Sequence, residues 1–196
     1  MPKEPKPPKL RCFIGIQFTL QDEIRSLLED LSQIDDEAAR IRIAPAKNLH
    51  ITLKFLGSVL ESQLDEIETR LKQLASRHEP LALHCEGIGF FKNSLWLGIS
   101  PNDRLCTLAA HLNQAFSSQA VGSNGQVANK KLYVPHVTLA RFSREAKPRL
   151  LLVKKKFEDT HWGDFQAKQF HLYRSQTLED GARYSIIDSY GLVDPV

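Results

Sequence analysis

Apolar residues recur along this chain at two different spacings, one typical of β-strands and the other typical of helices. Short apolar or alternating runs that are rich in aromatic and β-branched residues predict strands. These runs occupy residues 11–18, 48–56, 81–91, 94–100, 134–142, 169–176 and 183–192. The last two runs flank Asp180-Gly181, a pair that favours a tight turn, and so predict a hairpin.

Helices are predicted where apolar residues stand three and four positions apart. Such stripes cover residues 24–34, 64–74 and 105–116, and the segment 147–156 is expected to be helical in part. The first three stripes follow helix-start signals, which are a polar segment at 19–22, a capping box of Ser58 and Glu61, and Pro101. Residues 117–131 contain glycine, serine and asparagine and are expected to form an exposed loop.

The order of these elements indicates an α+β fold. Strands and helices do not alternate steadily, as the crossovers of a parallel sheet would require. The order strand, helix, strand, helix in the first half of the chain is echoed in the second half. We therefore expect two related lobes that face each other across a groove.

The N-terminal segment differs in composition from the rest of the chain. Residues 1–10 are rich in proline and lysine, which predicts a flexible, solvated basic tail before a single two-lobed domain at residues 11–196. No continuous apolar segment follows the N-terminal charges, as a secretory signal requires, and no window reaches the length of a transmembrane helix. A cytoplasmic protein without a membrane partner is expected.

Charge and cysteine content narrow the function classes. The net charge of +3 excludes a bulk polycation but permits a local basic groove for a phosphate-bearing substrate. Cys12, Cys85 and Cys106 are widely spaced and form no C-x-x-C pair. Reduced and mostly buried thiols are therefore expected, rather than a zinc knuckle or a disulfide framework.

Two nearly identical motifs carry the candidate chemistry. They are His50-Ile51-Thr52-Leu53 and His136-Val137-Thr138-Leu139, and each lies within a predicted strand. Positions i and i+2 of a strand project from the same face, so each motif presents an imidazole beside a hydroxyl. Two such strands placed together would surround one point with two histidines and two threonines.

This set of side chains suits the cleavage of a phosphodiester. One group must take a proton from the attacking oxygen, and another must give a proton to the departing oxygen. Histidine can serve in either role near neutral pH. Threonine hydroxyls can donate hydrogen bonds to the non-bridging oxygens, where negative charge is concentrated. Neither a metal nor another cofactor is required if one histidine is protonated and the other is neutral.

Structural and metal-binding interpretations compete with this one. One H-x-T motif in a strand is commonly an exposed polar pair without a role, but two copies in the same frame favour function. A zinc site would need a third ligand, and no H-x-H, H-E-x-x-H or nearby carboxylate accompanies either motif. The histidines outside the motifs are interpreted as ordinary surface or core residues; they are His78, His84, His111, His161 and His171.

Residues 48–57 (NLHITLKFLG) and 135–141 (PHVTLAR) resemble the paired motifs of the 2H phosphoesterase superfamily. The most similar branch is that of the bacterial and archaeal RNA 2′,3′-cyclic phosphodiesterases, also called 2′–5′ RNA ligases. Further similar segments lie at residues 11–16, 95–98, 172–175 and 183–184. The resemblance therefore spans the chain after its N-terminal tail.

The resemblance implies two pseudo-symmetric lobes with antiparallel sheets around a central cleft and helices outside. It also implies hydrolysis of a 2′,3′-cyclic phosphate to a 2′-phosphate without a metal, and 2′–5′ ligation as the reverse reaction. His50 would be the proton donor and His136 the proton acceptor, although the near identity of the motifs leaves these roles open. Thr52, Thr138 and Arg141 would bind the phosphate. Strict alternation puts Arg141 on the face opposite His136, so a bulge or the end of the strand must turn it, and a solvated arginine on the outer face is the alternative.

Two positions depart from the pattern of this family, and three aromatic residues are candidates for stacking on an RNA base. Lys131 stands where relatives often carry arginine, and it lacks the bidentate fork. Ile43 stands where relatives tend to carry tryptophan. Phe13, Tyr133 and Phe55 are the stacking candidates. For Phe55 a core position competes, because it alternates with the apolar face of its strand.

The implied partner is RNA with a 2′,3′-cyclic phosphate end, or a cyclic nucleotide. The chain is expected to act as a monomer without an obligate protein partner. A non-catalytic module that binds RNA ends is the alternative, and the two intact His-Thr pairs favour the enzyme. An enzyme for another cyclic or 2′–5′ linked nucleotide is a third interpretation, which loops such as residues 117–131 would decide.

Overall fold

The computed structural model describes residues 8–19, 22–34, 40–100, 102–117, 133–179 and 181–193. The strands are β1 (Lys9–Gln17), β2 (Ile41–Ile43), β3 (His50–Leu60), β4 (Leu81–Phe90), β5 (Ser94–Ile99), β6 (His136–Phe142), β7 (His161–Ala167), β8 (Gln169–Leu178) and β9 (Gly181–Gly191). The α-helices are α1 (Asp22–Ser32), α2 (Leu64–Ala75), α3 (Asp103–Ala115) and α4 (Lys147–Phe157). Short 3₁₀ helices are η1 (Ala46–Asn48), η2 (Glu61–Gln63) and η4 (Arg144–Ala146).

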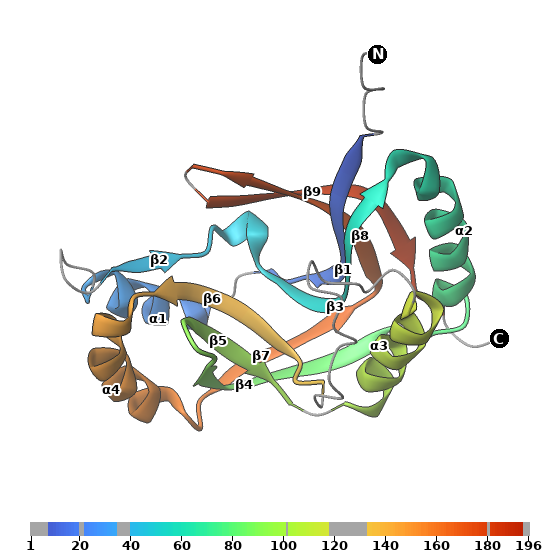
Figure 1. Cartoon of the computed structure of the whole chain (residues 1–196). Helices are drawn as coiled ribbons and strands as arrows, with labels where there is room; N and C mark the ends of the chain where they lie inside the picture. The colour runs from blue at the N-terminus through green and yellow to red at the C-terminus, as the bar shows by residue number, and fades with distance from the viewer. Residues whose placement is uncertain are drawn as a thin grey trace, which may run out of the picture.

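The described strands form one antiparallel sheet whose two halves are related by pseudo-symmetry (Figure 1). The strand order is β7-β4-β5-β6-β3-β1-β8-β9, and β2 pairs with the free part of β6. From the β3–β6 junction outward, β1, β8 and β9 on one side correspond to β5, β4 and β7 on the other. The predicted α+β fold with two lobes is confirmed, but the lobes are halves of one continuous sheet rather than separate sheets.

The helices are divided between the two lobes. Helix α2 contacts β9 and α3 contacts β3 in the first lobe, whereas α1 contacts β2 and β7 and α4 contacts β4 in the second. Figure 1 shows α2 and α3 at one end of the molecule and α1 and α4 at the other. Each lobe therefore carries one pair of helices.

The apolar stripes predicted for the helices are confirmed as core-facing. Burying one such side chain contributes roughly 1.5–3 kcal/mol to stability. Fully buried members are Ile24, Leu27 and Leu31 of α1, Ile67 and Leu71 of α2, and Leu105, Leu108 and Leu112 of α3. The cysteines are free, with Cys12 and Cys85 buried and Cys106 half-buried, as expected.

The capping box predicted at Ser58 and Glu61 is wrong. Strand β3 continues through Ser58, which pairs with Arg11 of β1. The side chain of Gln63 instead accepts a hydrogen bond from the backbone N–H of Leu60 at 3.0 Å. Helix α2 consequently begins only at Leu64.

The start of α3 also differs from the prediction, and Pro101 lies outside the described residues. The Asn102 side chain caps this helix by accepting a hydrogen bond from the N–H of Leu105 at 3.0 Å. Two strands, β2 and β7, were not predicted. Strand β2 has only three residues, and the apolar residues of β7 are interrupted by charged ones and Gly163.

The N-terminal boundary lies earlier than residue 10. Strand β1 begins at Lys9, which pairs with Leu60, so Lys9 and Leu10 belong to the sheet. Residues 1–7 of the predicted tail and residues 118–132 of the predicted loop lie outside the described residues. None of the helices in the described ranges is long and apolar enough to span a membrane.

Candidate active site

Strands β3 and β6 bring the two motifs together at the centre of the sheet. Ile51 pairs with Val137, and both side chains are completely buried. The neighbouring residues therefore project from the opposite face, and the antiparallel register sets His50 across from Thr138 and Thr52 across from His136. In a regular antiparallel pair, Cβ atoms directly across are about 5 Å apart and diagonal ones about 7–8 Å apart. We call these four residues the H-x-T quartet.

Both imidazoles are oriented by the same backbone contact. His50 Nδ1 lies 2.6 Å from the carbonyl oxygen of Asn48, and His136 Nδ1 lies 2.8 Å from that of Val134. A carbonyl oxygen only accepts, so Nδ1 carries the proton and donates in both rings. Nε2 is therefore the nitrogen that can exchange a proton with a substrate in each motif.

Burial and mutual repulsion set the protonation of the two rings. Desolvation lowers the pKa of both His50 and His136 from the usual value, and each carbonyl hydrogen bond partly opposes this. A positive charge on His136 lowers the pKa of His50 further. The free site consequently disfavours two protonated rings.

Aromatic rings hold His50 in place on the first lobe. Phe13 lies 4.7 Å from the His50 ring, and Tyr184 meets its face edge-on at 5.2 Å, measured between ring centroids. Tyr173 stacks on Phe13 at 4.7 Å and lies 5.9 Å from the His50 ring. Gly15 leaves room for this packing, because a Cβ there would lie 2.8 Å from the Ile51 carbonyl oxygen.

A smaller aromatic group holds His136 on the second lobe. Phe91 meets this ring edge-on at 4.9 Å, and Trp96 lies at 6.1 Å. Sequence reasoning missed Phe91, Trp96, Tyr173 and Tyr184 as parts of the site. Their positions follow from strand pairing between distant segments, which no local pattern encodes.

A β-bulge interrupts alternation at the same place in both motifs. In β3 the register to β1 shifts between Thr52 and Lys54, and in β6 the register to β5 shifts between Thr138 and Ala140. Both strands consequently show the same burial sequence over seven residues from the histidine. The bulge in β6 and the exposure of Arg141 put this residue on the same face of the strand as His136 and Thr138.

The core position considered for Phe55 is occupied instead by its neighbour Lys54. Strict alternation put Phe55 on the core face, but it is 65% exposed, whereas Lys54 is only 8% exposed. The bulge at Leu53 causes this exchange. Lys54 Nζ donates to Asn113 Oδ1 of α3 at 2.9 Å, and burial lowers the pKa of the Lys54 amine.

Of the three stacking candidates, only Phe55 presents an open ring. Phe13 is 3% exposed and enclosed by His50 and Tyr173, so the prediction for Phe13 is wrong. Its physical role is to support the imidazole. Tyr133 is half-buried and donates its hydroxyl to the Thr52 carbonyl oxygen at 3.0 Å, and burial raises its pKa. Tyr133 thus links the two motifs instead of standing open to a base.

The remaining sequence candidates lie away from the quartet or outside the described residues. Lys131 is outside the described residues, and Ile43 is half-buried in β2, paired with Ala140. His171 is buried beside Ser189, with 2.8 Å between Nδ1 and Oγ. The other histidines form surface contacts; these are His78 with His111, and His84 and His161 with Asp164.

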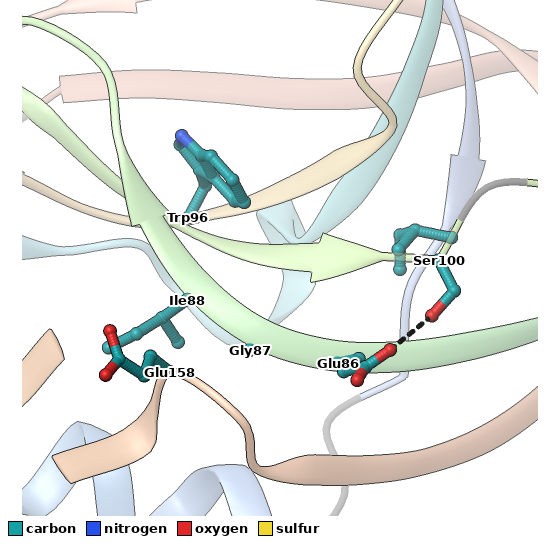
Figure 2. A pocket seen from close by; sticks show the side chains of 7 residues that line it. Glu86, Gly87, Ile88, Trp96, Ser100 and Glu158 are labelled. Atoms are coloured by element: carbon teal, nitrogen blue, oxygen red, sulfur yellow. Dashed lines mark hydrogen bonds between the residues drawn. The ribbon is translucent and has the colours of Figure 1, made fainter. Parts of the chain in front are cut away.

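A shallow pocket of about 300 Å³ lies near, but not at, the quartet (Figure 2). Its lining residues are Glu86, Gly87, Ile88, Trp96, Ile99, Ser100 and Glu158. Ser100 Oγ donates a hydrogen bond to Glu86 Oε2 at 3.0 Å. Figure 2 shows this pair at one end of the pocket and Glu158 towards the other end. Two carboxylates would repel a phosphate, so this pocket does not suit the substrate that the quartet suits. In the described part of the chain, no three His, Cys, Asp or Glu side chains are grouped to hold a metal ion.

The duplicated H-x-T strands, which pair side by side in a pseudo-symmetric antiparallel sheet, define a phosphoesterase of the two-histidine class. The profile of the 2′-5′ RNA ligase superfamily matches residues 20–178, and the chain belongs to this superfamily. The prediction made from the paired motifs is thereby confirmed.

Relatives along the whole chain agree with this assignment. The chain is 29% identical over 189 residues to the RNA 2′,3′-cyclic phosphodiesterase of Methanocaldococcus jannaschii, covering 92% of this chain and 100% of that protein. It is 24% identical over 189 residues to the RNA 2′,3′-cyclic phosphodiesterase of Aquifex aeolicus, covering 93% and 97%. The fold resembles the crystal structure of E. coli LigT complexed with 3′-AMP, with a TM-score of 0.71 at 24% identity, covering 95% of this chain and 100% of that chain.

Proposed function

We propose that this protein hydrolyses 2′,3′-cyclic phosphate ends of RNA, or of nucleotides, to 2′-phosphate ends. The observation that carries the proposal is the register of β3 and β6, which sets each histidine across from the threonine of the other motif. The names of the relatives from M. jannaschii and A. aeolicus support the same substrate class.

In the proposed reaction, Nε2 of one histidine removes a proton from water while the other histidine protonates the departing oxygen. The water oxygen forms a bond to phosphorus as the bond from phosphorus to O3′ breaks. The product has a 2′-phosphate and a free 3′-hydroxyl, and the two rings have exchanged protonation states. Each proton transfer contributes about 10²–10⁴-fold in rate.

The phosphate would be held by hydrogen bonds from both sides of the sheet junction. Thr52 and Thr138 donate their hydroxyls to non-bridging oxygens, where charge accumulates. Arg141 adds a guanidinium from the same face, which the bulge at Leu139 makes accessible. A positive charge there favours the bound anion and the developing charge in the transition state.

We assign His50 as the proton donor and His136 as the proton acceptor. In the free site, burial and the charge on His136 both disfavour protonated His50. A bound phosphate anion reverses this balance, because it stabilises the protonated form of a neighbouring imidazole. Proton donation by His50 is therefore a property of the complex. If a 5′-hydroxyl replaced water, the same steps would form a 2′–5′ linkage.

The test is to incubate the purified protein with adenosine 2′,3′-cyclic phosphate in excess chelator and to identify the product by phosphorus NMR. Adenosine 2′-phosphate is expected, and His111→Ala, an exposed histidine of α3, is expected to retain full activity as a control. Formation of the 3′-phosphate would contradict the assigned direction of cleavage. An unchanged substrate that nevertheless binds would identify a non-catalytic binding module.

A further inference from the structure

Two arginines stand directly across from each other beside the quartet. Arg42 of β2 pairs with Arg141 of β6, and both side chains are exposed. Because directly opposed residues of an antiparallel pair share a face, the bulge that turns Arg141 towards the quartet places Arg42 there too. Like charges in this position destabilise a sheet unless an anion lies between or beside them.

Neither guanidinium has an acidic partner within the described ranges. Three other arginines there do, and these pairs are Arg25 with Asp22, Arg70 with Glu66, and Arg104 with Glu79. No ion pair with a described residue therefore holds Arg42 or Arg141. Their pairing and exposure are features of a phosphate-binding surface, since a guanidinium can bind a phosphate with two parallel hydrogen bonds.

The Arg42 side chain reaches from one lobe towards the other. Its Nη1 lies 3.6 Å from the position that a Cβ on Gly181 would occupy, at the start of β9. The same part of the hairpin is fixed by Asn48, whose Nδ2 donates to the Ala182 carbonyl oxygen at 2.8 Å. Figure 1 shows the β8–β9 hairpin extending past η1 towards β2. Arg42 thus lies on the quartet's face beside Arg141, in the strand that pairs with β6 beyond its contact with β3.

The charges of the ligand decide what Arg42 can bind. A 2′,3′-cyclic phosphate is a phosphodiester with a single negative charge, and Arg141, one protonated histidine and two threonines already meet it in the proposed site. The single negative charge of a cyclic phosphate therefore does not require a second guanidinium. An RNA end supplies a second anion, the phosphodiester on the 5′ side of the terminal nucleotide.

We propose that Arg42 binds the phosphodiester that precedes the cyclic phosphate, so that the enzyme prefers oligonucleotide ends to cyclic mononucleotides. This inference rests on the proposed function and names its substrate class more narrowly. In this proposal Arg141 contacts the cyclic phosphate, whereas Arg42 contacts only the second anion. The substitution Arg42→Gln consequently separates the two contacts.

The test compares kcat/KM for adenosine 2′,3′-cyclic phosphate and for the dinucleotide ApA with a 2′,3′-cyclic end. The wild type is expected to favour the dinucleotide, and Arg42→Gln to lower its kcat/KM about 10-fold, the effect of losing one hydrogen bond to a charged group. The mononucleotide value is expected to stay unchanged. Arg42→Lys keeps the charge without the fork and is expected to lie between the two. Arg77→Gln, an exposed residue after α2, removes the same charge elsewhere and should change neither value.

Equal losses on both substrates would place Arg42 at the reacting phosphate, and no loss on either would leave it without a substrate contact; both results overturn the inference. Binding of the same two ligands to the His50→Ala protein, measured by calorimetry, reports the contact without turnover. Arg42→Gln on that background should weaken binding of the dinucleotide alone. A wild type that opens neither substrate would refute the proposed function, while this binding measurement would still decide the role of Arg42.

Discussion

Asn48 connects the first histidine to the β8–β9 hairpin, and its truncation should weaken both the fold and catalysis. Its backbone carbonyl oxygen accepts a hydrogen bond from Nδ1–H of His50, and the residue is buried, with 8% of its surface exposed. The side-chain Nδ2 donates to the Ala182 carbonyl oxygen at 2.8 Å. Asn48→Ala keeps the carbonyl but removes this link.

The size of the effect follows from what the substitution leaves behind. A lost hydrogen bond costs about 0.5–1.5 kcal/mol, and truncating a buried side chain adds a cavity. Removing Asn48 Oδ1, which is buried without a partner among the described residues, offsets part of this. We expect Asn48→Ala to lower the free energy of unfolding by about 1–2 kcal/mol. A displaced His50 should also lower kcat about 10- to 100-fold, because catalysis is sensitive to shifts of about 1 Å.

Val134 offers a matched control for Asn48. Its carbonyl holds His136 in the same way, but its side chain is 42% exposed. Val134→Ala should therefore change neither stability nor kcat appreciably. Urea unfolding and steady-state kinetics, under conditions where both variants are folded, provide the comparison. Equal behaviour of the two variants would refute the idea that the Asn48 side chain positions His50.

The remaining predictions concern the pH profile and two further contacts. Because burial lowers the pKa of His50 and of His136, the bell-shaped pH profile of kcat/KM should be centred below pH 6.5. A bound anion raises both pKa values, so the pH profile of kcat should be centred at higher pH. A maximum of kcat/KM above pH 8 would contradict this prediction. Tyr133→Phe removes the hydrogen bond to the Thr52 carbonyl and should cost about 1 kcal/mol of stability and lower kcat/KM, as urea unfolding and kinetics would show. Lys54→Met removes a buried amine from the face opposite the quartet. The free energy of unfolding should stay within about 1 kcal/mol of the wild-type value, and kcat should not change. A large loss of activity would contradict the placement of Lys54 outside the active site.

Local pattern was sufficient to predict the helices and the two motif strands. Apolar residues at helical spacing mark a buried face whatever that face packs against, so the stripes of α1, α2 and α3 were predictable. The duplicated H-x-T motif also indicated that two distant strands meet. The pairing of Ile51 with Val137 agrees with that inference.

The alternation of buried and exposed residues gave wrong predictions where pairing with a neighbouring strand decides which face a side chain occupies. The bulge at Leu53 moves Lys54 into the interior and Phe55 to the surface, and it arises from the pairing with β1. The shell around His50 was not predictable for the same reason. Phe13 and Tyr184 reach His50 from strands far apart in sequence, so neither position can be derived from the motif itself.

A double-mutant cycle of His50→Ala and His136→Ala tests most directly whether the two imidazoles act together on one phosphorus. Turnover of adenosine 2′,3′-cyclic phosphate would be measured for both single variants and for the double variant, with folding checked by circular dichroism. If the rings work as one acid–base pair, each single substitution removes almost all turnover and the double variant is hardly slower than either. Losses that multiply independently, or near-normal turnover in either single variant, would contradict the account.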